Sequence, residues 1–248
     1  MDRSPPIPGL SRSRCANSEA LARHALLVGI DIVLLLVTVI GGRIIPAFTN
    51  AALKQWGLAS SVSVSPGMTP LAITAMLALI AVDLWRPGGA AAGAVALGAA
   101  VIQAMRLAQW GARRTLRMPI VWVLHLAYLW LPVGLALKAL ALLGSLAFAA
   151  SYLHALTVGA AATMIVAVMT RASLGHTGRP LFVSRPTVCA YWLLAAAVLV
   201  RVFGPAGFPL RYTEVILAAA SLWTSAFAIL LIVYAPILLS PRADGKAG

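Results

Sequence analysis

The stretch Ser151–Leu181, SYLHALTVGAAATMIVAVMTRASLGHTGRPL, decides the fold of this 248-residue chain. It begins as an apolar run that carries His154, continues through small residues, and ends in a dense polar group at residues 175–180. An apolar run of about 20 residues is long enough to cross the hydrocarbon core of a membrane. The stretch therefore predicts a transmembrane helix that brings a polar corner to one edge of the membrane.

The composition of the whole chain is that of a membrane protein. Hydrophobic residues make up 61% of the sequence and charged residues only 10%, and the mean hydropathy is +0.94. A soluble domain carries about 25% charged residues on average. Because the apolar residues fall into several separate runs, we expect an all-α, polytopic bundle of transmembrane helices whose partner is the lipid bilayer.

Seven apolar runs are candidates for membrane spans. They cover residues 23–41, 70–85, 88–107, 120–143, 148–171, 188–202 and 214–238. We expect a disordered basic tail over residues 1–22, a seven-helix domain over residues 23–239 and a C-terminal tail over residues 240–248. Pro46 is expected to end the first span. Asp83 lies near the end of the second span, where we expect it at the level of the lipid head groups.

The net charge of +13 does not indicate a nucleic-acid partner. Arg and Lys sit between the apolar runs and form no basic stripe, which favours contact with anionic lipid and the positive-inside rule. The loops on the side of the C-terminus carry most of these charges, including Arg113, Arg114 and Arg117. We therefore expect a multi-pass protein with a cytoplasmic C-terminus.

The two cysteines of the chain, Cys15 and Cys189, form no zinc or c-type haem motif.

Two histidines, His125 and His154, lie inside predicted spans. Ionisable groups in a membrane cost about 2.5–3.5 kcal/mol on insertion scales, so they are functional candidates. An imidazole can ligate haem iron or copper; a neutral histidine that bridges two helices is the other interpretation. His125 shares a helix face with Tyr128. At about 1.5 Å per residue, the depths of His125 and His154 differ by roughly 10 Å, too much for one iron.

The polar corner at residues 175–180 offers several hydrogen-bonding groups at one place. Its two glycines allow close backbone approach, and His176, Thr177 and Arg179 supply donors. His176 is on the same side of the membrane as His125 and could meet it. Two interpretations are open: a ligand-binding corner, or a helix C-terminus with Gly175 at the C′ position and an interfacial arginine.

Two further positions are weaker candidates. Arg43, with Pro46 and Thr49, forms a similar corner on the same side of the membrane. Asp31 lies inside the first span, where it could serve as a proton or metal partner or as a hydrogen bond between helices. The sequence contains no hydrolase triad, no H-E-x-x-H motif and no phosphate-binding glycine loop. Catalytic residues are therefore unknown, and whether the protein is an enzyme stays open.

Four segments of the chain resemble the NnrS family. They are GGRIIPAFT (Gly41–Thr49), WVLHLAYLWLPVG (Trp122–Gly134), HALTVGAAATMIVAVMTRASLGHTGRPL (His154–Leu181) and YAPILLSPRADG (Tyr234–Gly245), in the order of the family. Its members are similar in being polytopic proteins of the bacterial inner membrane, reported to contain haem and copper. They are linked to denitrification and to the response to nitric oxide and nitrosative stress.

The resemblance implies a haem-associated role, with copper as the second cofactor to test. The metal-ligand candidates that it implies are His125, His154 and His176. Arg179 and Arg43, from the two polar corners, are further cofactor-binding candidates. Family members look longer, with additional spans before the Gly41–Arg43 corner, so the resemblance implies a missing N-terminal part. A homo-oligomer is the other partner that we consider. The alternatives are a small-solute membrane transporter and a truncated, non-functional fragment.

Overall fold

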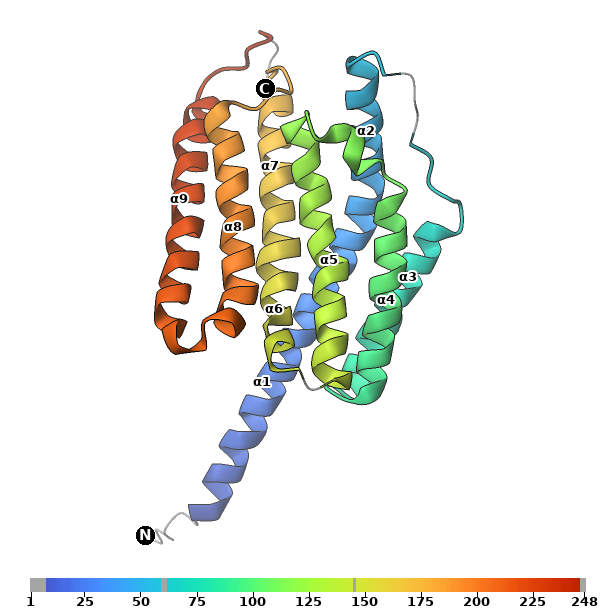
Figure 1. The fold of residues 1–248 in the computed structure, drawn as a ribbon, viewed down its shortest axis with the longest axis vertical. Helices are drawn as coiled ribbons and strands as arrows, with labels where there is room; N and C mark the ends of the chain where they lie inside the picture. The colour runs from blue at the N-terminus through green and yellow to red at the C-terminus, as the bar shows by residue number, and fades with distance from the viewer. Residues whose placement is uncertain (1–7, 59–61, 145, 246–248) are drawn as a thin grey trace, which may run out of the picture.

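The computed structural model describes residues 8–58, 62–144 and 146–245, and all regular structure in these residues is helical. Seven helical segments are long and apolar enough to cross a membrane. They are Leu21–Gln55, Met68–Trp85, Ala90–Ala108, Pro119–Leu143, Phe148–His176, Arg185–Gly207 and Pro209–Leu239. The predicted all-α, seven-span bundle is therefore confirmed (Figure 1).

The first span is part of one long helix, composed of α1 (Pro8–Leu36), the π-helical turn η1 (Val37–Gly41) and α2 (Gly42–Gln55). The expectation that Pro46 ends this span is wrong, because Pro46 lies inside α2. Proline removes one backbone bond, whereas ending the helix in lipid would expose many more unpaired groups. The tail predicted as disordered, 1–22, overlaps α1; residues 1–7 lie outside the described residues.

The remaining elements follow in chain order. They are α3 (Met68–Trp85), α4 (Ala90–Ala108), η2 (Ala112–Thr115), α5 (Pro119–Leu143), η3 (Ala147–Ser151), α6 (Tyr152–His154), η4 (Ala155–Ala162), α7 (Thr163–His176), α8 (Arg185–Gly207), η5 (Pro209–Arg211) and α9 (Tyr212–Leu239). The fifth span thus contains a second π-helical segment, η4, between α6 and α7. Wide π turns shift the register of a helix and are frequent at functional sites.

Helix α5 forms the centre of the bundle. Of its most apolar stretch, 72% is buried inside the bundle, whereas only 22% of the corresponding stretch of the last span, Pro209–Leu239, is buried. The elements α4, α2, η4 and α7 surround α5, while α8 and α9 form a hairpin on the outer side of α7 (Figure 1). Large apolar side chains of α9, such as Leu231, Ile232 and Leu239, are exposed. Lipid is the solvent that suits such a surface.

Loops and termini divide the bundle into two ends (Figure 1). The C-terminal end contains the loop after α2, η2, the segment between α7 and α8, and residues 240–245. The opposite end, here called the α3–α4 end, contains the turn Arg86–Gly89, η3 and η5. His125 lies near the start of α5, at the C-terminal end. The loop that contains Arg113, Arg114 and Arg117 therefore lies at the same end as the C-terminal residues (Figure 1), as the sequence predicted.

Small residues let the fifth span pack tightly against α5. A Cβ atom on Gly159 would lie 2.6 Å from Cγ of Trp130, and one on Gly134 would lie 2.6 Å from Cδ2 of Leu156. Real non-bonded carbons do not approach this closely, so glycine is required at both positions. This contact explains the run of small residues that begins at Gly159.

We predict that Gly159→Ala destabilises the bundle by about 1–3 kcal/mol, the usual cost of overpacking a core. The added methyl group would force the ring of Trp130 away from η4. The measurement is the thermal unfolding transition of the protein in detergent, followed by tryptophan fluorescence. Gly98→Ala is the matched control, because a Cβ at this exposed helical glycine meets nothing within 4 Å. Equal transitions for the two variants would contradict the packing argument.

Candidate functional site

A backbone carbonyl in the π-helical turn η1 takes a partner from another helix. Thr38 is fully buried, and its hydroxyl donates to the carbonyl of Leu34 at 2.9 Å. Its own carbonyl accepts a hydrogen bond from Nη1 of Arg106 at 2.8 Å, in addition to one from the amide of Gly42. A carbonyl oxygen has two lone pairs, so it can accept both bonds.

Arg106, in the last turn of α4, is completely buried. Besides the carbonyl of Thr38, its guanidinium donates to the Tyr128 hydroxyl at 3.2 Å and to Oγ1 of Thr69 at 3.3 Å. It also lies 5.5 Å from the ring centroid of Trp110, a cation–π distance. No acidic side chain of the described residues forms an ion pair with it. Neutral dipoles and an aromatic face therefore stabilise this charge.

Gly42 is the residue that lets the guanidinium reach the first span. A Cβ atom at this position would overlap the guanidinium of Arg106. The GGR corner picked out in the sequence thus serves a residue 64 positions further along the chain. Arg43, in contrast, is exposed. The structure does not bring Arg43 to the buried network.

Two side chains close the network around Arg106. The Tyr128 hydroxyl donates to Oε1 of Gln103 at 2.6 Å, and Nε2 of Gln103 donates to Oγ1 of Thr38 at 3.2 Å. Both Gln103 and Tyr128 are fully buried. This hydrogen-bond network therefore joins η1, α4 and α5, and Arg106 extends it to α3 through Thr69. We call Thr38, Gln103, Arg106 and Tyr128 the arginine network.

His125 lies one helical turn from Tyr128 on the same buried face of α5, as the spacing predicted. Its Nε2 is 3.0 Å from Oγ1 of Thr49. The Thr49 hydroxyl donates its single proton to the carbonyl of Ile45, at 2.8 Å. The hydroxyl must then accept from His125, so Nε2 carries the ring proton. In the neutral imidazole, Nδ1 is left with a lone pair, and no hydrogen-bond partner from the described part of the chain reaches it.

A cavity of about 340 Å³ borders His125. Its lining is mostly apolar and aromatic: Leu107, Ala112, Leu116, Trp122, His125, Leu126, Leu129 and Trp192. Leu116 and Trp192 are largely exposed, so the cavity opens on the lipid-facing surface. Trp110 packs on the inner side, 6.5 Å from the imidazole and 4.5 Å from the Tyr128 ring. His125 thus stands between the arginine network and an apolar cavity.

The other two candidate ligands lie elsewhere. His154 is half-buried at the end of α6, near the α3–α4 end of the bundle, whereas His176 is exposed at the last residue of α7. Across residues 8–58, 62–144 and 146–245, no group of three or more His, Cys, Asp or Glu side chains could hold a metal ion. His125 and His154 are thus at opposite ends of the bundle, as their depths predicted.

The polar corner at residues 175–180 ends a helix and anchors the C-terminal tail. The amide of Arg179 bonds to the carbonyl of Leu174 at 2.9 Å and that of Gly178 to the carbonyl of Gly175 at 3.2 Å, the two bonds of a Schellman motif. The left-handed residue is Gly178, with φ of +68°, so the expectation that Gly175 takes the C′ position is wrong. Gly175 instead supplies one of the carbonyls.

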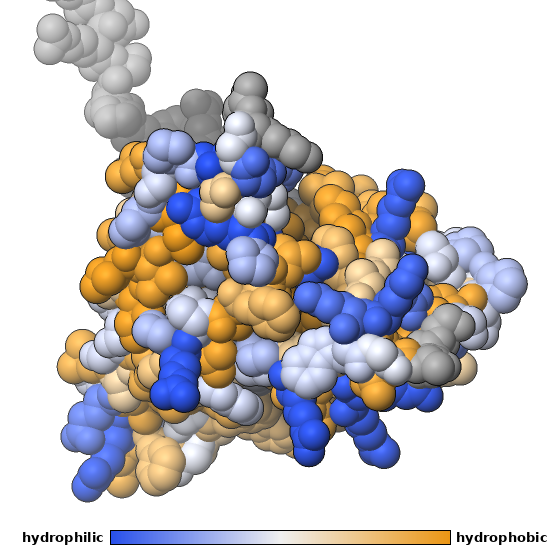
Figure 2. All heavy atoms as spheres, turned by 90° about the horizontal axis from the view of Figure 1, so that it is seen from above, coloured by the Kyte–Doolittle hydropathy of each residue, from blue (hydrophilic) through white to orange (hydrophobic). Residues whose placement is uncertain are grey.

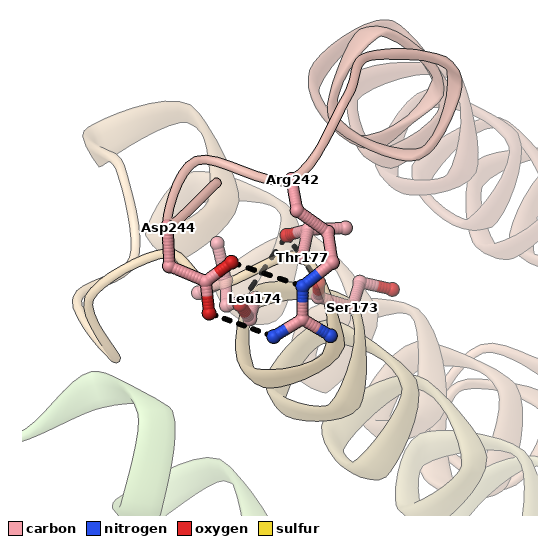
Figure 3. Close-up of polar contacts among 5 residues, drawn as sticks. All are labelled: Ser173, Leu174, Thr177, Arg242 and Asp244. Carbon is pink, nitrogen blue, oxygen red and sulfur yellow. Dashed lines mark hydrogen bonds and ion pairs between the residues drawn. The ribbon is translucent and has the colours of Figure 1, made fainter. Parts of the chain in front are cut away.

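The tail packs directly on this corner (Figure 3). The amide of Ala243 bonds to the carbonyl of Thr177 at 2.9 Å, and a Cβ on Gly178 would meet the carboxyl group of Asp244. Asp244 accepts two hydrogen bonds from Arg242, at 2.9 and 2.7 Å, which raise the pKa of the guanidinium.

Arg179 is half-buried, and its Nη1 donates to the carbonyl of Ile237 at 3.3 Å. The Thr177 hydroxyl donates to the carbonyls of Ser173 and Leu174 (Figure 3). The donors of Thr177 and Arg179 thus have structural partners.

A second buried polar site lies toward the α3–α4 end. Lys138 of α5 forms an ion pair with Asp83 of α3, and Asp31 of α1 is their neighbour. The expectation that Asp83 lies at head-group level is wrong, because its exposure is only 3%. The ammonium group of Lys138, 55 positions away in sequence, draws the carboxylate inward.

Arg106 and Lys138 are the functional candidates that sequence reasoning missed. Arg106 lies at the end of the predicted span 88–107 and Lys138 lies inside the predicted span 120–143, and neither is among the candidates named from the sequence. An ionisable residue in a span is a signal by itself. For Arg106, Gln103 one turn earlier marks the same helix face.

Comparison with known proteins gives one family. The family model described as NnrS protein matches residues 11–242, nearly the whole chain and all seven spans. No curated protein matches the sequence, and no solved structure matches the fold.

We predict that Tyr128→Phe destabilises the protein by about 1–3 kcal/mol, because it leaves the buried Gln103 carbonyl without its donor and Arg106 without one acceptor. The thermal transition in detergent measures this effect. Tyr212→Phe is the control, since this tyrosine is 53% exposed and should give the wild-type transition. A neutral Tyr128→Phe would mean that the arginine network does not hold the helices together.

Proposed function

The chain belongs to the NnrS family, and on this basis we propose that it is a haem- and copper-containing protein of the bacterial inner membrane. Its role, on this proposal, is in the response to nitric oxide and nitrosative stress. The observation that carries the proposal is His125, a buried imidazole with one nitrogen fixed by Thr49 and the other without a partner beside an apolar cavity.

The surroundings of His125 fit a metal ligand. Histidines that bind metals donate their second ring N–H to a neighbouring group, which fixes the tautomer and the orientation of the ring. The contact of Nε2 with Thr49 supplies this arrangement and leaves the lone pair of Nδ1 free. A metal bound at Nδ1 would supply a redox-active centre or a binding site for a small gas molecule.

The residues around His125 would control access to such a group. Trp122 and Trp192 offer flat apolar surfaces in the cavity, and their ring centroids are 4.9 Å apart. These side chains suit a macrocycle or an uncharged diatomic molecule and exclude water. Trp110 lies between the imidazole of His125 and the buried guanidinium of Arg106. The guanidinium therefore places a fixed positive charge on the side of His125 that faces Trp110.

The remaining ligand candidates support the proposal less. His154 is half-buried at the opposite end and would serve a separate group there, with its further ligands supplied from outside the described residues. His176 is exposed, so it would serve only a group at the surface, with Arg179 beside it. Arg43 is exposed as well. We therefore rank His125 first among the predicted ligands.

The charge distribution supports a cytoplasmic C-terminus. Lys and Arg side chains gather at the C-terminal end of the bundle, among them Arg113, Arg117 and Arg185. Figure 2 shows hydrophilic side chains spread over this end, with apolar ones between and beside them. The positive-inside rule assigns such an end to the cytoplasm. His125 would then lie near the cytoplasmic surface of the membrane.

We predict that the purified protein has the absorption bands of bound haem or copper and that His125→Ala loses them. Thr49→Val should keep the ligand but weaken metal binding by about 10-fold, as loss of a supporting hydrogen bond does. His176→Ala is the control and should keep the bands. Metal content per protein, measured with the spectra, decides the result; wild-type bands in His125→Ala would exclude this histidine as a ligand.

The cellular role predicts a growth phenotype. Cells that lack the protein should grow more slowly under a nitric oxide donor, and the wild-type gene should restore growth while His125→Ala should not. Membrane levels of each variant, measured by immunoblotting, separate loss of function from loss of protein. Equal growth of deleted and complemented cells under the donor would contradict the proposed role.

A further inference from the structure

Three ionisable side chains meet inside the membrane, far from His125. Asp31 of α1, Asp83 of α3 and Lys138 of α5 have exposures of 3%, 3% and 5%. We call them the buried triad. Lys138 lies 13 residues after His125 on α5, which is about 20 Å at ~1.5 Å per residue. The buried triad is therefore separate from the candidate metal site.

The charges of the buried triad do not balance when all three groups are ionised. Lys138 and Asp83 form an ion pair, which leaves the carboxylate of Asp31 as an excess negative charge. An uncompensated charge in a membrane interior is strongly unfavourable. Either a cation or a proton must therefore neutralise it. A metal cation is disfavoured by the adjacent ammonium group and by the absence of a third His, Cys, Asp or Glu ligand among the described residues.

The position of the two carboxyl groups favours the proton. Asp31 on α1 and Asp83 on α3 are neighbours, on helices that pack together. Two neighbouring carboxylates repel, whereas a carboxylic acid donates to a carboxylate. Oδ2 of Asp31 is fully buried and has no hydrogen-bond partner among the residues that the structure describes. A proton shared by the two carboxyl groups satisfies both the charge balance and the hydrogen bonding.

We propose that the buried triad is a proton-binding site, in which Asp31 and Asp83 together hold one proton at neutral pH beside the ammonium group of Lys138. The step is a simple exchange: a carboxylate accepts a proton from water and later returns it. The site is neutral when the proton is bound and carries one negative charge when it leaves.

The α3–α4 end of the bundle is the nearer route for this proton. Asp83 lies two residues before the end of α3, and Lys138 lies five residues before the end of α5. The other ionisable groups near the site are Tyr152, half-buried at the start of α6, and Arg23 on α1. Tyr152 therefore lies between the buried triad and the α3–α4 end of the bundle.

The test is the infrared carbonyl band of a protonated carboxylic acid in the full-length protein, reconstituted in liposomes at neutral pH. The chain has only six Asp and Glu residues, so a single buried acid can be assigned. We expect one such band in the wild-type protein and its loss in Asp31→Asn. Glu214→Gln, which alters an exposed carboxylate, should leave the band unchanged.

A variant of Lys138 and an isotope exchange test the shared proton further. Lys138→Met should roughly double the band, because both carboxyl groups would then be protonated. Transfer of the wild-type protein to D₂O should shift the band, which shows that the proton exchanges with solvent. No band in the wild-type protein, or a band that survives Asp31→Asn, would overturn the proposal. A band that D₂O does not shift would overturn the exchange step.

Discussion

A fully buried guanidinium is the constraint on which the C-terminal end of this bundle depends. Arg106 has to find hydrogen-bond acceptors inside a membrane, where water cannot supply them. The carbonyl of Thr38 is one acceptor, and Gly42 gives the room for close approach. Tyr128, Gln103 and Thr69 bring the fourth, third and second spans into the same network. Arg106 thus contacts the irregular turn η1, the glycine at position 42 and the polar face of α5.

The same central helix contributes polar side chains to both buried sites. Tyr128 and His125 lie on α5 toward the C-terminal end, and Lys138 lies on it toward the α3–α4 end. The long first helix supplies a partner at each level: Thr49 for His125, Thr38 for Arg106, and Asp31 for the buried triad. The first helix therefore contributes to both polar sites, through α5 at His125 and at the buried triad and through α4 at Arg106.

Much of the architecture follows from the sequence, because lipid imposes a simple requirement. Seven apolar runs predicted seven spans, and the spacing of His125 and Tyr128 predicted their shared face. The sequence does not reveal the positions of polar groups whose partners are distant along the chain. Whether Arg106 turns outward or inward depends on the carbonyl of Thr38, 68 positions earlier. Asp83 is drawn into the bundle by Lys138, and the backbone bonds of a Schellman motif select Gly178 rather than Gly175 as the left-handed residue.

On the proposed function, Nδ1 of His125 binds the metal while Thr49 holds Nε2. Pulsed electron paramagnetic resonance of the paramagnetic centre, in protein labelled with nitrogen isotopes at histidine, is the measurement that separates the two ring nitrogens. We expect a coupling from the remote nitrogen of one histidine, lost in His125→Ala and altered in Thr49→Val because the hydrogen bond to Nε2 disappears. A centre without histidine coupling, or a coupling that is unchanged in both variants, would exclude His125 as the ligand.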